Sequence, residues 1–503
     1  LVRKYTITSG NTDWLTSAGT TTNNSEWIVL DQDTWDYVGS HPYYFSELLD
    51  SLLINEQFIA DAWSINTMIS VDDVDNIFLS DDDSNTRTVI GGMDMDQDGY
   101  DEMIMTDYNG HRVIVYEYDI TAGSFNQVWS SSVIEETNQS SNPRTVGVGD
   151  LDNDGRQEIV FPSSSTGAEG WYIYEWDGVA GSDDYGTSPS SINTIEIDVC
   201  CSDDATAFRG DHDRTTIEDV DGDGQQELVI MIRRGDPRGT LITSVDGNIE
   251  HNGGGSETWV QEFFVDRADY GGGSPMHSLP ADLNGDGHMD LVNHTWTYLN
   301  FYNITSTGPD AYAVAEAGSD GSYYQATYPS DQVSLFGGAA GDVDGDGNDE
   351  AYFVSYGSWG VGTGDVYVVD YDSGDDVLTI GEDHVRKIAS GSEGLNSWAT
   401  GSISDVDGNG SPNIFFGGAK ISSMECFGDP RDSLSYITED IYSYEFVSDI
   451  TIRDSAGVTT TMVSHNDGFI SKVQSNFNGS LLDFDNDGRQ EILVGFQGVP
   501  AVV

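Results

Sequence analysis

The residues best suited to chemistry stand in the stretch GDLDNDGRQEIVF, near residue 150. Three aspartates occupy alternate positions, Asp150, Asp152 and Asp154, and are followed by Gly155 and Glu158. Carboxylates packed this closely repel one another unless a positive charge lies among them. Oxygen ligands at positions 1, 3 and 5, a glycine at position 6 for a sharp turn, and a further carboxylate are what a calcium loop requires. The spacing therefore predicts a calcium site.

The same nine-residue pattern recurs along the chain. Its seven copies, loops 1 to 7, begin at Asp94, Asp150, Asp219, Asp282, Asp342, Asp405 and Asp483. Side chains at positions 1, 3, 5 and 9 and the main-chain carbonyl of position 7 are the predicted ligands. The predicted side-chain ligands are Asp94, Asp96, Asp98, Glu102, Asp150, Asp152, Asp154, Glu158, Asp219, Asp221, Asp223, Glu227, Asp282, Asn284, Asp286, Asp290, Asp342, Asp344, Asp346, Glu350, Asp405, Asp407, Asn409, Asn413, Asp483, Asp485, Asp487 and Glu491. The predicted carbonyl ligands belong to Tyr100, Arg156, Gln225, His288, Asn348, Ser411 and Arg489.

The loops are not equivalent. Loops 1, 2, 3, 5 and 7 carry all four acids, whereas Asn284 replaces one acid in loop 4. Loop 6 is the weakest, because Asn409 and Asn413 replace two acids. We therefore expect about six to seven bound calcium ions with a structural role. Magnesium fits less well, since it prefers a small octahedral shell that retains water.

The EF-hand, a rival calcium loop, places a bidentate glutamate at position 12 and continues into a helix. None of the seven copies has an acid there: position 12 is held by Met105, Phe161, Ile230, Asn293, Phe353, Phe416 and Val494. Apolar runs such as IVF and ILV follow the loops, and alternating runs such as HRVIVYEYD and GWYIYEWDG come next. Such alternation predicts strands. We therefore expect an all-β chain whose metal loops join strands, with one helical candidate at 43–63.

These repeats resemble the FG-GAP and VCBS repeats of calcium-stabilised β-propellers, such as the headpiece of integrin alpha chains. The stretches LFGGAAGDVDGDG and FFGGAK add to the likeness, which covers residues 86–503. The resemblance implies a seven-bladed β-propeller. The segment 1–85 would then cap or close the ring, with 25–39 supplying the outer strands that the last blade lacks. Alternatively, this segment would insert into a neighbouring molecule and build a filament.

Composition limits the partners. The 503 residues carry a formal net charge of −68, which would repel nucleic acid and anionic membranes. The apolar runs are too short to span a membrane. The chain begins without Met or an apolar signal core, as an exported and processed protein or a trimmed chain would. Glycosylation sequons begin at Asn23, Asn138, Asn293, Asn303 and Asn478.

Three cysteines are too few for a disulfide scaffold. Cys200 and Cys201 are adjacent, and Cys426 lies far away. A strained neighbouring pair, an intermolecular bond and buried free thiols all fit this count. A Cys201–Cys426 bond is disfavoured, because about three repeats separate the two positions.

The sequence thus predicts a secreted, calcium-stabilised β-propeller that serves as a structural or adhesive module at the cell surface. Protein or glycan partners, or self-assembly into a filament or layer, would fit this role. A glycan-binding, lectin-like module is one alternative. A pectin-type polysaccharide lyase is another, since some lyases use similar propellers and Arg233, Arg234 and Arg238 cluster in one loop.

Overall fold

The computed structural model describes residues 88–134, 143–194, 215–304, 323–325, 334–377, 384–389 and 402–462 with short gaps, together with 2–3, 27–28, 470–474, 493–496 and 499–502. The chain forms two compact units, Leu1–Ser64 and Ile65–Val503. In the first unit, β1 (Val2–Arg3) pairs antiparallel with β2 (Trp27–Ile28). The helical candidate at 43–63 and the rest of 25–39 lie outside the described residues, so the ring-closing role of 1–85 stays a prediction.

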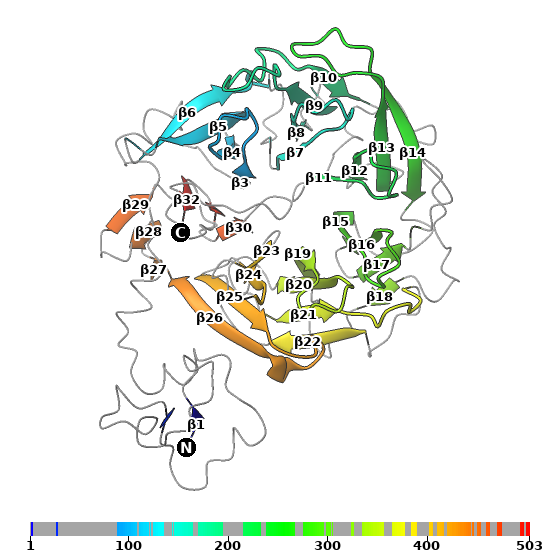
Figure 1. Cartoon of the computed structure of the whole chain (residues 1–503), viewed down its shortest axis with the longest axis vertical. Helices are drawn as coiled ribbons and strands as arrows, with labels where there is room; N and C mark the ends of the chain where they lie inside the picture. Colours follow the sequence, from blue (N-terminus) through cyan, green and yellow to red (C-terminus); the bar gives the residue numbers. More distant parts are fainter. Residues whose placement is uncertain are drawn as a thin grey trace, which may run out of the picture. The chain divides into compact units, whose positions relative to one another are not determined.

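The second unit is a β-propeller of six four-stranded antiparallel sheets arranged around a common centre (Figure 1). Blade 1 consists of β3 (Val89–Met93), β4 (Glu102–Asp107), β5 (Arg112–Asp119) and β6 (Ser124–Ser130). Blade 2 consists of β7 (Gly147–Gly149), β8 (Glu158–Ser163), β9 (Gly170–Glu175) and β10 (Ser191–Asn193). Blade 3 consists of β11 (Thr216–Glu218), β12 (Glu227–Ile232), β13 (Gly239–Asp246) and β14 (Thr258–Asp266). Blade 4 consists of β15 (Pro275–Ala281), β16 (Asp290–Thr295), β17 (Tyr298–Tyr302) and β18 (Tyr323–Gln325). Blade 5 consists of β19 (Ser334–Gly341), β20 (Glu350–Tyr356), β21 (Val366–Val369) and β22 (Val385–Ala389). Blade 6 consists of β23 (Ser402–Ser404), β24 (Asn413–Phe416), β25 (Lys420–Cys426) and β26 (Tyr436–Ser443). Within each blade the strands pair in chain order.

The prediction of seven blades is wrong, because the described residues form six four-stranded blades. The sequence count assumed that every motif marks a four-stranded blade. Loop 7 instead falls between β30 (Ile470–Gln474) and β31 (Leu493–Phe496), which form a three-stranded sheet with β32 (Val499–Val502). This sheet contacts β3 of blade 1 and β23 and β24 of blade 6. A further three-stranded sheet comprises β27 (Glu445–Phe446), β28 (Ile450–Arg453) and β29 (Thr459–Met462).

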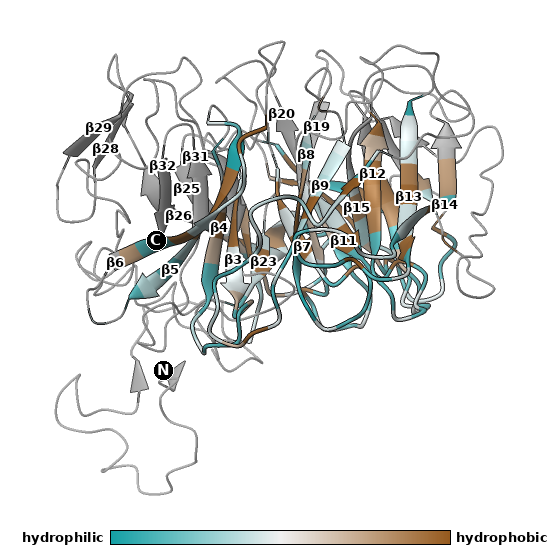
Figure 2. Cartoon of the chain, turned by 90° about the horizontal axis from the view of Figure 1, so that it is seen from above, coloured by the Kyte–Doolittle hydropathy of each residue, from teal (hydrophilic) through white to brown (hydrophobic). Residues whose placement is uncertain are grey.

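The blades are held together by apolar side chains between neighbouring sheets. Successive residues of a strand point to opposite faces, so each blade contributes to two such layers. In β8, Ile159 packs in the layer shared with blade 1, and Val160 packs in the layer shared with blade 3. Both side chains are fully buried. The strand interiors are accordingly hydrophobic, whereas hydrophilic loops gather along one edge of the blades (Figure 2).

The acidic loops sit at equivalent places in every blade. In blade 2 the residue before the loop, Gly149, pairs with Glu158 at position 9, so the loop closes the hairpin between the first two strands. The same pairing of positions recurs in the other five blades. Because the strands of each blade follow one another outward in the same order, the loops lie at the same end of the blades. Six of the seven predicted metal loops thus share one edge of the ring.

The structure locates one predicted glycosylation sequon and one cysteine. Asn293, the first residue of a predicted sequon, is only 2% exposed within β16 and donates a hydrogen bond from Nδ2 to Thr240 Oγ1 at 2.6 Å. A glycan on this side chain would not fit the folded blade. Cys426 is a buried free thiol, and Cys200 and Cys201 lie outside the described residues. Among the described residues, no helix is both long and apolar enough to cross a membrane.

Candidate metal centres

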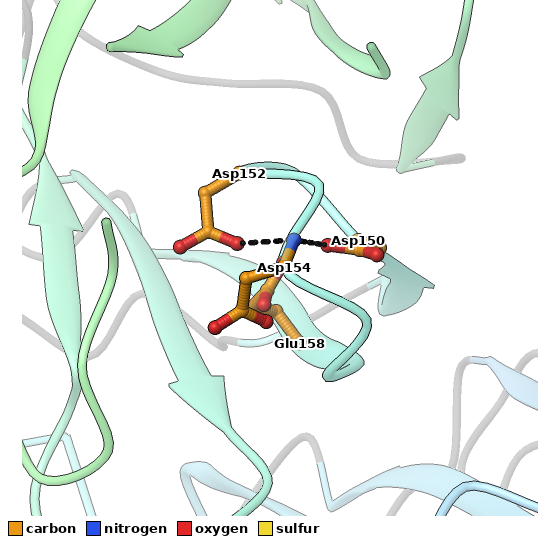
Figure 3. Close-up of side chains that lie close together, drawn as sticks. All are labelled: Asp150, Asp152, Asp154 and Glu158. Atoms are coloured by element: carbon orange, nitrogen blue, oxygen red, sulfur yellow. Dashed lines mark hydrogen bonds between the residues drawn. The ribbon is translucent and has the colours of Figure 1, made fainter. Parts of the chain in front are cut away.

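Loop 2 brings its four predicted acids together. Asp150, Asp152, Asp154 and Glu158 each offer an oxygen, and these four oxygens all lie within 4.8 Å of one another. Figure 3 shows the three aspartates on the turn and Glu158 at the start of β8, beneath them. The backbone N–H of Asp154 donates to Oδ1 of Asp150 at 3.0 Å and to Oδ1 of Asp152 at 3.3 Å. The backbone of the turn therefore gathers the carboxylates around one point.

The glycine at position 6 is required by the backbone. Gly155 has a φ of +90° and donates its N–H to Oδ2 of Asp150 at 2.9 Å. This left-handed conformation is costly for residues with a Cβ atom. The corresponding glycine has a positive φ in all six blades, from +86° at Gly287 to +98° at Gly99. The repeated glycine thus reflects the turn geometry that aims the position 1 carboxylate inward.

The carboxylate at position 9 is the buried member of each cluster. In loops 1 to 5 it is at most 2% exposed, at Glu102, Glu158, Glu227, Asp290 and Glu350. One oxygen of each accepts a hydrogen bond from the backbone N–H of position 2. This bond ties the start of the second strand to the turn. The other carboxylate oxygen takes no part in this bond.

That second oxygen lacks a hydrogen-bond partner in three loops. Oε1 of Glu102, Glu158 and Glu350 is buried and makes no hydrogen bond. Burial raises the pKa of Glu102 and Glu350 to about 9, and it raises the pKa of Glu158 well above its ordinary value. A buried carboxylate without a partner is costly. A cation among these oxygens would remove the cost, and an all-oxygen donor set suits a hard divalent ion.

Loops 1, 3 and 5 repeat this cluster with three acids. Oxygens of positions 1, 3 and 9 lie within 4.8 Å of one another at Asp94, Asp96 and Glu102, at Asp219, Asp221 and Glu227, and at Asp342, Asp344 and Glu350. The position 5 aspartate in these loops accepts the backbone N–H of position 7, at 2.9 Å for Tyr100 and Asn348 and 2.7 Å for Gln225. The carbonyl role assigned to position 7 stays a prediction.

Loop 4 keeps the turn despite its asparagine. Oδ1 of Asn284 accepts the N–H of Asp286 at 3.2 Å, as the position 3 aspartate does in other loops. Its Nδ2 instead donates to the carbonyl of Asp375 at 3.3 Å. Burial raises the pKa of Asp290, the position 9 acid, to about 8. The amide thus supplies the same oxygen with one negative charge fewer.

The two remaining loops are described in part or not at all. In loop 6, Asp405 accepts the N–H of Gly410 at 2.8 Å, but Asp407 and Asn409 lie outside the described residues. Asn413 at position 9 donates Nδ2 to Oε1 of Glu425 at 2.6 Å, so its amide nitrogen is committed to the next strand. That loop 6 is the weakest site stays a prediction. Loop 7, from Asp483 to Glu491, lies outside the described residues.

Sequence reasoning missed a second row of acids. Strand register places a carboxylate opposite position 9 in blades 1, 2 and 6, where Glu117 pairs with Glu102, Glu175 with Glu158, and Glu425 with Asn413. In blade 5, Asp370 immediately follows β21 and influences the pKa of Glu350. These acids lie 12 to 20 residues after position 9 at varying distances, so the sequence pattern alone does not single them out. Only the strand register reveals them.

Of the three arginines that the sequence suggested for a lyase site, the structure describes one. Arg233 and Arg234 lie outside the described residues, and Arg238 directly precedes β13. The structure therefore does not test whether the three arginines converge.

The sequence of residues 94–161 matches the FG-GAP-like repeat family. No curated protein sequence matches the chain. Among solved structures, Sqt1 of Saccharomyces cerevisiae is similar with 9% identity and a TM-score of 0.45, over 84% of this chain and 96% of that one. The exotype rhamnogalacturonan lyase YesX is similar with 15% identity and a TM-score of 0.38, over 83% and 72%. An Agrocybe aegerita lectin specific for non-reducing terminal N-acetylglucosamine has 15% identity and a TM-score of 0.38, over 76% and 86%. At these scores the likenesses carry no argument about activity.

Proposed function

Since the chain is a β-propeller that carries an FG-GAP-like repeat, we propose that its acidic loops bind calcium and that the metal-loaded propeller is a structural or adhesive module outside the cell. The observation that carries the proposal is the buried, partnerless Oε1 of Glu102, Glu158 and Glu350 beside the other loop carboxylates. The predicted ligands of loops 1 to 7 would hold the ions, with loop 6 as the weakest site. Each bound ion would neutralise its carboxylates and fasten the first hairpin of the blade.

Calcium suits the loops better than magnesium. Loop 2 gathers four carboxylate oxygens on one turn, and a backbone carbonyl is available at position 7. Calcium accepts six to eight oxygen ligands in flexible geometry, whereas magnesium demands a near-ideal octahedron and retains water. The carboxylate clusters of loops 1, 2, 3 and 5 offer oxygen to the ion, which also disfavours softer metals.

The extracellular assignment follows from calcium supply and charge. Extracellular calcium modules work at dissociation constants of about 10⁻⁴ to 10⁻³ M, in media where calcium is abundant. A chain with a net charge of −68 repels itself when compact, and bound divalent ions offset part of that repulsion. A calcium-rich medium therefore supplies the divalent ions that would offset this repulsion.

The partners we propose are proteins or glycans at the cell surface, or further copies of this chain. Propellers bind partners through loops on the rigid frame of their blades, and fold alone does not specify which. The strong negative charge directs us to partners that are neutral or basic, or that are bridged by calcium. Nucleic acid and direct membrane insertion do not belong to the proposal.

The first test is calcium binding by isothermal titration calorimetry on the full chain, with magnesium as the control ion. We expect about six to seven sites that take calcium in preference to magnesium. Absence of calcium binding at millimolar concentration would overturn the proposal.

The second test is negative-stain microscopy with calcium or chelator, in which regular assemblies would favour self-assembly and single rings would favour a separate partner.

A further inference from the structure

The side chain at position 3 of a loop matches the group that the next blade presents to it. In loop 2, Oδ2 of Asp152 accepts the backbone N–H of Ile249 in blade 3 at 2.6 Å. In loop 4, Nδ2 of Asn284 donates to the backbone carbonyl of Asp375 in blade 5 at 3.3 Å. An ionised carboxylate could not make this second bond, because it has no proton to donate. The amide therefore suits blade 5, and loop 4 consequently has one negative charge fewer than loops 1, 2, 3 and 5.

A carboxylate of loop 5 lies against loop 4. Oδ2 of Asp349 accepts the backbone N–H of Asp282 at 2.9 Å, and the N–H of Asp349 donates to the carbonyl of Asp282 at 2.8 Å. Asp282 is position 1 of loop 4, and its own carboxylate accepts the N–H groups of Asp286 at 3.1 Å and Gly287 at 3.0 Å. These contacts hold the Asp349 carboxylate beside the residue that provides the first predicted ligand of loop 4.

Loops 4 and 5 are in close contact. A Cβ atom at Gly285, position 4 of loop 4, would lie 2.3 Å from Oδ1 of Asn348, position 7 of loop 5. The backbone N–H of Gly374 in blade 5 also donates to the carbonyl of Asn284 at 2.9 Å. Because the backbone of loop 4 is held by blade 5 at both Asp282 and Asn284, the place of the Asp349 carboxylate relative to loop 4 is fixed.

The residue type at position 8 follows the charge of the preceding loop. Position 8 of loops 2 to 6 is held by Gln157, Gln226, Met289, Asp349 and Pro412. Asp349 is the one acid among them, and among the preceding loops 1 to 5, loop 4 alone lacks an acid. Beside the four acids of loop 2, the neutral amide of Gln226 accepts the corresponding N–H, that of Asp150. The hydrogen bond therefore does not require a carboxylate.

We propose that Asp349 supplies to the ion of loop 4, from across the blade interface, the negative charge that Asn284 does not. It acts through Asp282 as a positioning residue and is not a ligand. This inference rests on the proposed calcium function of the loops. In a partly buried site, a carboxylate near a divalent cation attracts it strongly, because water screens the charges less there than in bulk. The affinity of loop 4 for calcium would thus depend on blade 5.

The test compares crystals of the full chain and of Asp349→Asn, equilibrated at graded calcium concentrations, with anomalous difference maps that give the occupancy of each loop. The asparagine can still accept the N–H of Asp282, so the variant removes the charge alone. Because ligand charge tunes the affinity of calcium loops over orders of magnitude, we expect half-occupancy of loop 4 to require about tenfold more calcium. Loops 2 and 3 should be unchanged.

The matched control is Asp372→Asn, which makes the same charge change in blade 5 at a carboxylate 2.9 Å from Nη2 of Arg431. It should leave the occupancy of loop 4 unchanged. An unchanged loop 4 in Asp349→Asn, or equal shifts at loops 4 and 5, would overturn the inference and leave the proposed function standing. Absence of calcium from loop 4 alone in the unsubstituted chain would also overturn only the inference, whereas absence from every loop would overturn both.

A second pair of variants rebuilds the same arrangement between loops 2 and 3, without altering blade 5. Asp152→Asn should lower the calcium occupancy of loop 2, and adding Gln226→Glu should recover part of it, since a carboxylate then lies against Asp150. Failure to recover would contradict the charge compensation. In excess chelator, Asp349→Asn should melt no lower than the unsubstituted chain, because no hydrogen bond is lost. A lower melting temperature there would overturn the inference in favour of a packing role for Asp349.

Discussion

Oε1 of Gln226 accepts a hydrogen bond from the backbone N–H of Asp150 at 2.8 Å, although the two residues belong to different blades. Gln226 is position 8 of loop 3, and Asp150 is position 1 of loop 2. Asp349 makes the same connection from loop 5, accepting the N–H of Asp282 in loop 4 at 2.9 Å. The side chain at position 8 thus links neighbouring loops. An ion bound in loop 3 would therefore help to hold the turn of loop 2.

Gln226→Leu should weaken calcium binding at loop 2 as well as at loop 3. It should lower the free energy of unfolding in calcium by about 1 kcal/mol, the usual net worth of one hydrogen bond. Urea unfolding followed by circular dichroism measures this change. Gln157→Leu is the matched control, because Gln157 occupies position 8 of loop 2 and its side chain makes no hydrogen bond to a described residue. Equal effects of the two variants would refute the link.

Removal of calcium should lower the melting temperature substantially. A ligand present at 10 to 100 times its dissociation constant contributes about 1.4 to 2.7 kcal/mol per site. Several such sites approach the typical net stability of a domain, about 5 to 15 kcal/mol. Differential scanning calorimetry in calcium and in excess chelator tests this, with magnesium added back as the control. Superimposable melting curves in calcium and chelator would contradict a structural role for the ion.

In chelator, stability should fall as the pH rises. Burial raises the pKa of Glu102, Glu227 and Glu350 from 4.5 to about 9 in the metal-free fold. Between these values the folded chain holds protons that the unfolded chain has lost, so the free energy of unfolding decreases with increasing pH. Calcium binds the ionised form and should reverse this trend. Urea titrations at pH 5.5 and pH 8, with and without calcium, measure both slopes, and a rise in stability with pH in chelator would count against the assignment.

Glu158→Gln should have opposite effects in the two conditions. With calcium, loss of the ligand charge should weaken binding at loop 2 at least about tenfold, which corresponds to about 1.4 kcal/mol. In chelator the neutral amide should leave the protein equally or more stable, because it removes a buried acid while an oxygen can still accept from Leu151. Calorimetric titration and thermal melts of the same preparation separate the two effects. Destabilisation in chelator would show that the acid serves packing and not metal.

The parts of this structure that depend on nearby residues were predictable. The spacing of Asp150, Asp152 and Asp154 indicated a turn with convergent oxygens, and alternation in the following residues indicated strands. Both depend on interactions within about ten residues, and the structure places them as expected. The weakness of loop 6 stays a prediction, which rests on the amide of Asn413 having a donor where an acid has only acceptors.

Features that depend on distant contacts were not predictable. The number of complete blades depends on whether every motif gains four strands, and the described residues around loop 7 supply three. The opposition of Glu117 to Glu102 requires the register of two strands. The hydrogen bond from the N–H of Gly181 in blade 2 to the carbonyl of Asp96 in loop 1 requires the position of a second blade. None of these relationships leaves a fixed spacing in the sequence.

Loops 1 to 6 join the first two strands of their blades, so mutual repulsion of their carboxylates is concentrated at one rim of the ring. The apolar layers between blades, such as the packing around Ile159 and Val160, extend along the strands away from that rim. If the loops bind calcium as proposed, its removal would restore the repulsion between carboxylates at this rim. The blades would then separate at this rim before the apolar layers unfold.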